Sequence, residues 1–195
     1  IAGRAFLRMA YFTPTVLPMV AVANIWLFFY TPDYGLLDQA LGLVGLRGRN
    51  WLGDSETVMA CLIAMTIWKE AGFFMIFYLA ALQQISPALL EAANLEGASY
   101  GQTLRRIILP LLMPTTLFVM VNAVINSVRM IDHIVVLTRG GPDNASTLLL
   151  FHLYEVGFRY WDSGYAAALT MVLLVLLATV ALLQFFVLDR KVHYK

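Results

Sequence analysis

Long runs of apolar residues constrain the fold of this chain more than any other feature of its sequence. A helix needs about 20 mostly apolar residues to cross a bilayer, because lipid offers no hydrogen-bond partner to an open main chain. Four runs qualify, at about 13–30, 58–82, 110–137 and 165–188. Hydrophobic residues make up 61% of the chain and charged residues only 13%, whereas soluble domains average about 25% charged. We therefore predict an all-α, polytopic transmembrane helical bundle.

Three more polar stretches, at 31–57, 83–109 and 138–164, separate the predicted spans. Lysine and arginine collect in the short loops on the cytoplasmic side of a membrane. One set of flanks carries Arg4, Arg8, Arg105, Arg106, Arg190, Lys191 and Lys195, and the other carries Arg47, Arg49, Arg139 and Arg159. The larger set predicts that both termini and 83–109 are cytoplasmic, with 31–57 and 138–164 as outer loops.

The segment 83–109 is predicted to form a helix–turn–helix, here called the knob. Ser86-Pro87 is a helix start signal, with serine as the cap and proline as the first helical residue. Gly97 can adopt a positive φ, which ends a helix and reverses the chain. A second short helix is expected from about Ser99 to Ile108, and Pro110 marks re-entry into the third span.

Residues 91–110 also carry a pattern of fixed positions. Glu91-Ala92-Ala93 is followed by three residues and Gly97, then by nine residues, Ile107, one residue and Leu109-Pro110. This pattern resembles the EAA signature of permeases in binding-protein-dependent ABC importers. Other segments resemble the carbohydrate-uptake branch of these permeases, namely Asn50–Leu52, Leu79–Gln83, Gly140–Pro142 and Gly164–Tyr165.

The resemblance implies a type I ABC importer permease (MetI-like) fold, from which this chain is expected to lack the first two helices. It also implies that the knob couples to a separate ATPase, with Glu91 and Gly97 as coupling residues and Ala92 and Ala93 on the contact face. The full implied coupling set is Glu91, Ala92, Ala93, Gly97, Ile107, Leu109 and Pro110.

The partners that the resemblance implies are two copies of an ATP-binding subunit, a second homologous permease and an extracytoplasmic solute-binding protein, at the bacterial inner membrane. The implied solute is a mono- or oligosaccharide or glycerol 3-phosphate. Nucleic acid is not an expected partner.

Motifs for catalysis or cofactor binding are missing from the sequence. It contains no GxxxxGK[ST] phosphate loop, GxSxG elbow, HExxH helix or CxxC pair. His133, His152 and His193 lack metal-ligand spacing, so we expect no metal, no cofactor and no enzymatic activity in this chain.

Polar residues within the third predicted span suggest a translocation path. Asn122, Asn126, Arg129 and His133 are spaced at i, i+4, i+7 and i+11, which predicts one helical face. Asn122 and Asn126 suit either a solute-lined cavity or hydrogen bonds between neighbouring helices. The spacing leaves both interpretations open.

Lys69 and Glu70 stand inside the second predicted span, where an ionisable side chain costs about 2.5–3.5 kcal/mol or more. Both are candidates for the translocation path, although an ion pair with another span, involving Arg129 or Asp132, is favoured over solute contact. An alternative function is an ion-coupled secondary transporter or channel, with Lys69, Glu70 and Asp132 as coupling charges. A membrane-embedded enzyme would need a convergent catalytic set, which the sequence does not show.

Overall fold

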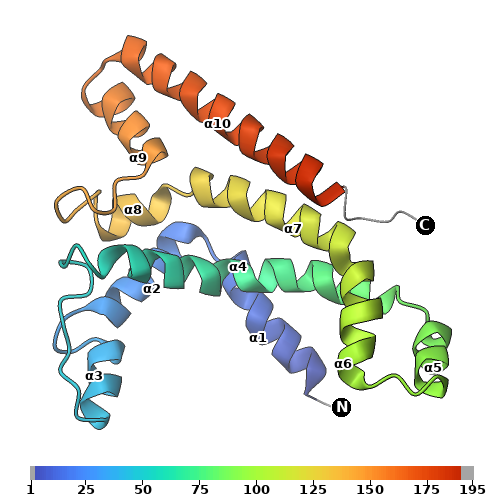
Figure 1. The fold of residues 1–195 in the computed structure, drawn as a ribbon. Coiled ribbons are helices and arrows are strands. Elements are labelled where there is room, and N and C mark those ends of the chain that lie inside the picture. The colour runs from blue at the N-terminus through green and yellow to red at the C-terminus, as the bar shows by residue number, and fades with distance from the viewer. Residues whose placement is uncertain (1–2, 190–195) are drawn as a thin grey trace. The chain divides into compact units, whose positions relative to one another are not determined.

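The computed structural model describes residues 3–189, whose elements are helices and connecting loops (Figure 1). The expected all-α class is confirmed, since these residues contain no strand. The chain divides into two compact units. Unit 1 comprises the chain up to Gly72 together with 127–173, and unit 2 comprises 73–126 and the chain from Leu174. Arg190, Lys191, His193 and Lys195 lie outside the described residues.

Three helical stretches of the described chain are long and apolar enough to cross a membrane. The first is α4 (Val58–Gln83), which matches the predicted span at 58–82. The third is α10 (Ser163–Asp189), which contains the predicted span at 165–188. The second, Tyr100–Leu137, is built from α6 (Tyr100–Thr103), the π-helical segment η1 (Leu104–Ile108), α7 (Leu109–Arg129) and α8 (Asp132–Leu137).

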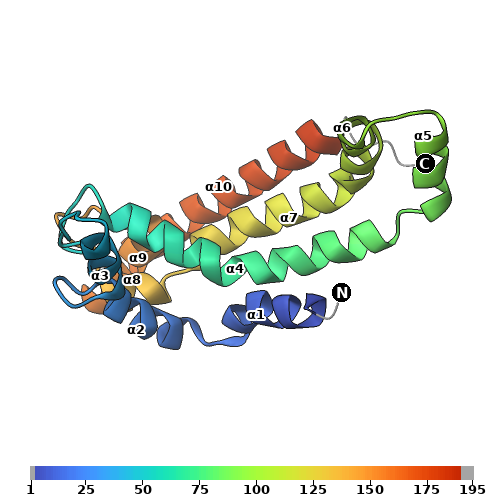
Figure 2. The ribbon, with the colours of Figure 1, turned by 90° about the horizontal axis from the view of Figure 1, so that it is seen from below.

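The predicted first span at 13–30 is not one continuous helix. The structure has two helices, α1 (Arg4–Val16) and α2 (Met19–Tyr30), which a short non-helical link joins (Figure 2). The two helix axes bend by 104° at this link. Pro14 lies in the last turn of α1, and Pro18 stands immediately before α2. A proline disfavours helical dihedrals in the residue before it, and Leu17 accordingly is extended, at φ −71° and ψ 139°. The two prolines therefore account for the break.

The second helix of the knob does not end at about Ile108, contrary to our expectation. It continues through α6, η1 and α7, which follow one another without a break. Proline lacks an N–H, and its ring crowds the carbonyl four residues earlier, here that of Arg106. The π-helical hydrogen bonding of η1, which spans Arg106, widens the helix at this point. The knob and the third span thus share one helix.

The third predicted span at 110–137 is interrupted near its end. Helix α7 stops at Arg129, and Met130 and Ile131 separate it from α8. Within unit 1, α8 packs against α2. The buried side chains of Leu62, Ile134 and Phe151 form one cluster of this unit's core, and a second cluster consists of Val22, Ala23 and Met65.

Both predicted outer loops contain short helices, namely α3 (Leu36–Leu43) in the first and α9 (Leu149–Tyr154) followed by η2 (Glu155–Arg159) in the second. The loops meet where the Ser55 hydroxyl donates to Asp143 Oδ2 over 3.4 Å. In the second loop the fully buried Ser146 hydroxyl lies 2.7 Å from both Thr138 Oγ1 and the Gly141 carbonyl oxygen. These contacts give the turn after α8 a fixed conformation.

In unit 2 the second half of α4 packs against α7. The Tyr78 hydroxyl donates to Thr116 Oγ1 at 3.3 Å, and the ring centroids of Phe77 and Phe118 lie 4.9 Å apart. These contacts hold the two helices that enter and leave the knob.

Candidate functional site

Helix α5 (Pro87–Leu95) forms the first half of the knob and begins where the sequence predicted (Figure 1). Pro87 is its first residue, and Ser86 occupies the N-cap position. The Ser86 side chain makes no capping hydrogen bond, so the expected role of this serine as a bonded cap is wrong. The start of α5 rests on the preset φ of the proline and not on a side-chain cap.

The turn at Gly97 closes α5 by a Schellman motif. The Ala98 N–H donates to the Ala93 carbonyl and the Gly97 N–H donates to the Asn94 carbonyl, each over 3.0 Å. Gly97 has a φ of 77°, which side-chain-bearing residues rarely adopt. The predicted role of Gly97 in ending the helix and reversing the chain is confirmed.

A capping box starts the second half of the knob. The Gln102 N–H donates to Ser99 Oγ over 3.4 Å, and the Ser99 N–H donates to Gln102 Oε1 over 2.8 Å. This reciprocal pair fixes the first turn of α6 directly after the reversal. Local hydrogen bonds therefore shape the knob on both sides of the reversal.

Exposure within the knob differs from the expected contact face. Glu91 and Ala92 are exposed, but Ala93 is only 6% exposed. Ala93 lies under the Schellman turn, whose closing bond its own carbonyl accepts, so its assignment to the contact face is wrong. Leu95, at 90% exposed, and Tyr100, at 81%, carry the knob's most open large apolar side chains. Sequence reasoning missed this pair, although both flank Gly97 within an otherwise polar stretch.

The remaining members of the implied coupling set do not lie on the turn. Ile107 belongs to η1 and is half-buried, while Leu109 and Pro110 are exposed at the start of α7. Arg105 and Arg106 are exposed in η1. The far end of the signature thus lies on the helix that joins the knob to the third span.

The polar residues of the third span are not all on one helix. Asn122 and Asn126 lie half-buried on α7, and Arg129 is the exposed last residue of that helix. The Asn122 side chain donates from Nδ2 to the Phe118 carbonyl over 2.8 Å. His133 belongs to α8, beyond the break, so the expected four-residue face is wrong at this position. His133 is 4% exposed, and its Nδ1 has no partner among the described residues.

Lys69 is buried in α4 at 8% exposure. Its ammonium donates to main-chain carbonyls where α1 ends, and no ion pair involves it within the described part of the chain. The ion pair expected for Lys69 is therefore wrong, and its N–H groups are directed at the protein main chain. Glu70, the next residue, is half-buried.

An apolar groove of about 600 Å³ lies between α1 and the first half of α4. Its lining residues are Ala10, Tyr11, Pro14, Ala64, Ile67, Trp68 and Ala71. A polyhydroxylated solute would leave most of its hydroxyl groups unpaired in such a lining. The groove is thus no match for a carbohydrate.

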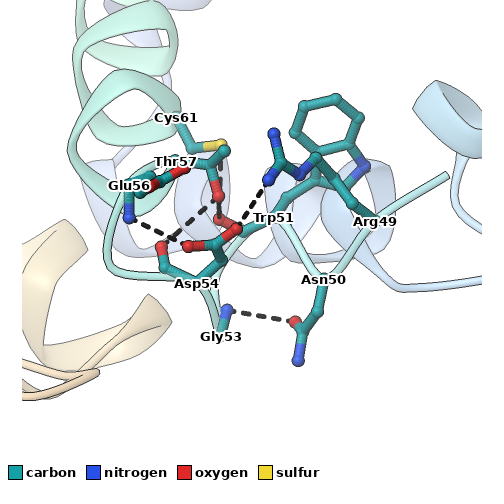
Figure 3. A network of polar contacts seen from close by, with 8 residues as sticks. All are labelled: Arg49, Asn50, Trp51, Gly53, Asp54, Glu56, Thr57 and Cys61. Carbon is teal, nitrogen blue, oxygen red and sulfur yellow. Dashed lines mark hydrogen bonds and ion pairs between the residues drawn. The ribbon is translucent and has the colours of Figure 1, made fainter.

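The first outer loop is held by a polar network between α3 and α4 (Figure 3). Arg49 and Asp54 form an ion pair with an N–O distance of 2.9 Å. The Trp51 carbonyl accepts from Thr57 Oγ1 over 2.8 Å and from Cys61 Sγ over 3.7 Å, which ties the loop to the start of α4. This network fixes Trp51, a residue of the carbohydrate-branch resemblance.

Asp38 anchors the same loop from α3. Its carboxylate accepts from Trp51 Nε1 over 2.6 Å and from the Asp33 N–H over 2.9 Å, and the side chain is almost fully buried. The hydrogen bond from Trp51 is the main cause that lowers the pKa of Asp38 below its ordinary value, followed by the bond from Asp33. These bonds identify Asp38 as a structural residue of the loop.

The chain matches a known protein family over almost its whole length. The family described as "Binding-protein-dependent transport system inner membrane component" matches residues 2–194. The chain is 33% identical to the probable ABC transporter permease protein YurN of Bacillus subtilis, over 92% of this chain and 62% of that protein. It is 34% identical to the trehalose/maltose transport system permease protein MalF of Thermococcus litoralis, over 90% and 59%.

A third relative is the sn-glycerol-3-phosphate transport system permease protein UgpA of Pectobacterium atrosepticum. It is 32% identical over the whole of this chain and 65% of its own length. This chain therefore spans about three fifths of the length of the curated relatives it matches.

Two solved structures share the fold. One is a bacterial ABC transporter involved in the import of the acidic polysaccharide alginate, with a TM-score of 0.85. The other is a bacterial alginate ABC transporter in complex with an alginate pentasaccharide-bound periplasmic protein, with a TM-score of 0.87. Each is 28% identical in sequence and is matched over 97% of this chain and 66% of the solved chain.

Proposed function

Because the chain belongs to the family of binding-protein-dependent transport system inner membrane components, we propose that it is the permease subunit of an ATP-driven importer for carbohydrates. Its relatives are named for trehalose and maltose or for sn-glycerol 3-phosphate, and these names support a sugar or a related compound as the solute. The chain forms part of the translocation path, and ATP hydrolysis takes place in a partner subunit.

The observation that carries this proposal is the form of the knob. Helix α5, which bears the exposed Glu91, and the turn at Gly97 project between two helices that are apolar enough to span a membrane. Helix α6 continues through η1 into α7, so a force on the turn is passed along one helix. We assign the turn to a groove on an ATP-binding subunit, which is present in two copies.

The assembly also contains a second homologous permease and an extracytoplasmic solute-binding protein. The knob and the termini face the cytoplasm of a bacterial cell, and loops 31–57 and 138–164 face outward at the inner membrane. A loaded binding protein docks on the outer side, and closure of the ATPase subunits moves the two knobs. The spans then open inward and release the solute.

For the solute path we propose Asn122 and Asn126, with Arg129 and Glu70 as further candidates. Asn122→Ala should raise the KM for uptake, because an amide that contacts the solute is lost. Asn24→Ala is the matched control, since Asn24 in α2 makes the same bond to the carbonyl four residues earlier, over 2.8 Å. Equal KM values in both variants would remove Asn122 from the path.

The coupling role is tested in liposomes that contain the complete importer. Loaded binding protein should stimulate ATP hydrolysis by the unmodified complex, and this stimulation should vanish in Glu91→Gln and in Gly97→Val. Glu96→Gln is the control, because Glu96 is an exposed acid of the same turn outside the signature. Stimulation that persists in both Glu91→Gln and Gly97→Val contradicts the proposal.

Two further measurements identify the energy source of transport and the solute. Uptake that collapses with an uncoupler while ATP is held constant would instead favour the ion-coupled transporter. A thermal-shift panel of sugars and sugar phosphates on the cognate binding protein identifies the solute. Stabilisation by neither class would contradict the carbohydrate assignment.

A further inference from the structure

The bend between α1 and α2 leaves main-chain carbonyls open inside an apolar stretch. The last carbonyls of any helix lack a helical partner, and lipid contains no water to satisfy them. Only part of this deficit is met locally, where the Leu17 N–H donates to the Pro14 carbonyl over 3.3 Å. The 104° bend therefore needs hydrogen-bond donors from another element.

Lys69 of α4 supplies these donors. Its Nζ lies 3.4 Å from the carbonyl oxygen of Pro14, 3.2 Å from that of Thr15 and 3.0 Å from that of Leu17. An ammonium has three N–H donors and no acceptor, so three carbonyls match its full capacity. A positive charge is also favoured at the carbonyl end of a helix, here the end of α1. The number of donors and the sign of the charge both suit the bend.

Two further contacts hold α1 against α4 at the same level. The Thr15 hydroxyl donates to the Lys69 carbonyl over 3.0 Å, so that each of these residues bonds to the other's main chain. One turn along α4, a Cβ atom on Gly72 would clash with the Tyr11 carbonyl oxygen. Only glycine permits this close approach of the two backbones. The lysine thus acts within a tightly packed helix contact.

We propose that Lys69 is a positioning residue that locks the bent pair α1–α2 onto α4, so that α1, α2 and the first half of α4 move as one body during transport. Separation of α1 from α4 would leave the Lys69 ammonium and the Thr15 and Leu17 carbonyls without these hydrogen bonds at membrane depth, which is strongly disfavoured. The transport part of this proposal rests on the proposed function, but the lock itself depends only on these contacts.

Distances measured by pulsed electron paramagnetic resonance test the lock in the assembled transporter. Nitroxides are attached at Leu7→Cys on α1 and Phe28→Cys on α2, both exposed, in a Cys61→Ser background. The distance distribution should be narrow and should not change between the resting and ATP-bound states. Lys69→Met should broaden it in both states, and Lys69→Gln, with two N–H donors and no charge, should give an intermediate width.

Thr66→Val is the matched control, because Thr66 is a polar residue one turn earlier on α4 that bonds only within its own helix, to the Leu62 carbonyl. Its distribution should equal that of the parent. A shift between nucleotide states in the parent protein would overturn the one-body claim, even if Lys69→Met fails to assemble. A narrow, unshifted distribution in Lys69→Met would show that Lys69 is not the lock.

A second readout links the lock to transport. If the bent pair must stay rigid to transmit motion, Lys69→Met lowers the number of solute molecules imported per ATP several-fold while ATP hydrolysis continues. An unchanged ratio would contradict the positioning role. Uptake that needs no ATP would refute the proposed function instead, and the distance distributions would still decide the lock.

Discussion

The two buried residues Lys69 and Asp38 are hydrogen-bonded to neutral groups and form no ion pair among the described residues. Lys69 is held by three carbonyls, and Asp38 accepts one main-chain N–H and one indole N–H. The sequence located Lys69 at membrane depth, but an ion pair was the expected partner. Carbonyls lose their helical hydrogen-bond partners where a helix breaks. The reach of Lys69 to the break after α1 depends on tertiary packing that no local sequence pattern contains.

At this scale we predict an acid-dependent loss of stability from Asp38. Its folded pKa is lowered, so its contribution is complete above the pKa of an unfolded aspartate, about 3.9, and is lost as the pH falls through the folded value. The protein should be more stable than Asp38→Asn at pH 7, and this difference should shrink below about pH 4. Thermal unfolding in detergent measures this difference in stability. Both proteins are compared at constant ionic strength across pH 3–7, in steps of about one unit.

Trp51→Phe provides the comparison for this prediction, because it removes the main cause of the lowered pKa. In a Trp51→Phe background the effect of Asp38→Asn at pH 7 should be smaller. A stability difference that stays constant down to pH 3 would contradict the role of the ionised carboxylate.

The helices of this chain are shaped by prolines in two different ways. Pro14 and Pro18 break the first predicted span, whereas Pro110 lies inside a continuous helix that is widened by η1. Sequence reasoning predicted the start of α5 and the reversal at Gly97, because both follow from local dihedral preferences. Whether a proline breaks or merely widens a helix depends on the contacts around it, and those predictions failed.

At the scale of an element, we predict that the turn after α5 needs glycine for its dihedral angles and not for space. A Cβ atom on Gly97 would meet no atom within 4 Å, but φ is 77°. Gly97→Ala should therefore lower the free energy needed to open the turn by about 1–2 kcal/mol, the cost of a left-handed conformation. Hydrogen exchange of the Ala98 amide, which closes the Schellman motif, measures this change.

Gly101→Ala is the matched control for the turn. Gly101 also has no atom within 4 Å of a Cβ, but it lies in α6 without a positive φ. Alanine there should stabilise the helix by about 0.5–1 kcal/mol. If both alanine variants change the exchange of Ala98 equally, the left-handed turn is not the reason for glycine at position 97.

For the molecule as a whole, the sequence was most informative where a long pattern or a long motif existed. The all-α permease fold is confirmed by two solved importer structures with TM-scores of 0.85 and 0.87. Helices α4 and α10 were located from hydrophobic length alone. The side-chain partners of the polar residues were not predictable, since hydropathy states which residues are in lipid but not which residues face one another.

The orientation of the chain gives a prediction at this scale. Seven basic residues on one set of flanks and four on the other predict that Gly97 is cytoplasmic and Asn144 is external. Alkaline phosphatase, which is active only outside the cytoplasm, should be inactive when fused after Gly97 and active when fused after Asn144. A green fluorescent protein fused at the same positions should show the reverse pattern. Activity of the phosphatase at Gly97 would invert the topology.

Leu95 and Tyr100 are exposed apolar side chains on either side of the turn at Gly97, and they bear on how the cell produces this protein. Exposed apolar surface of this kind attracts chaperones and proteases. On the proposed function, a copy made without the ATP-binding subunit would keep these side chains exposed and should be degraded by the cell's quality control. We therefore expect this chain to accumulate only when that subunit is produced with it.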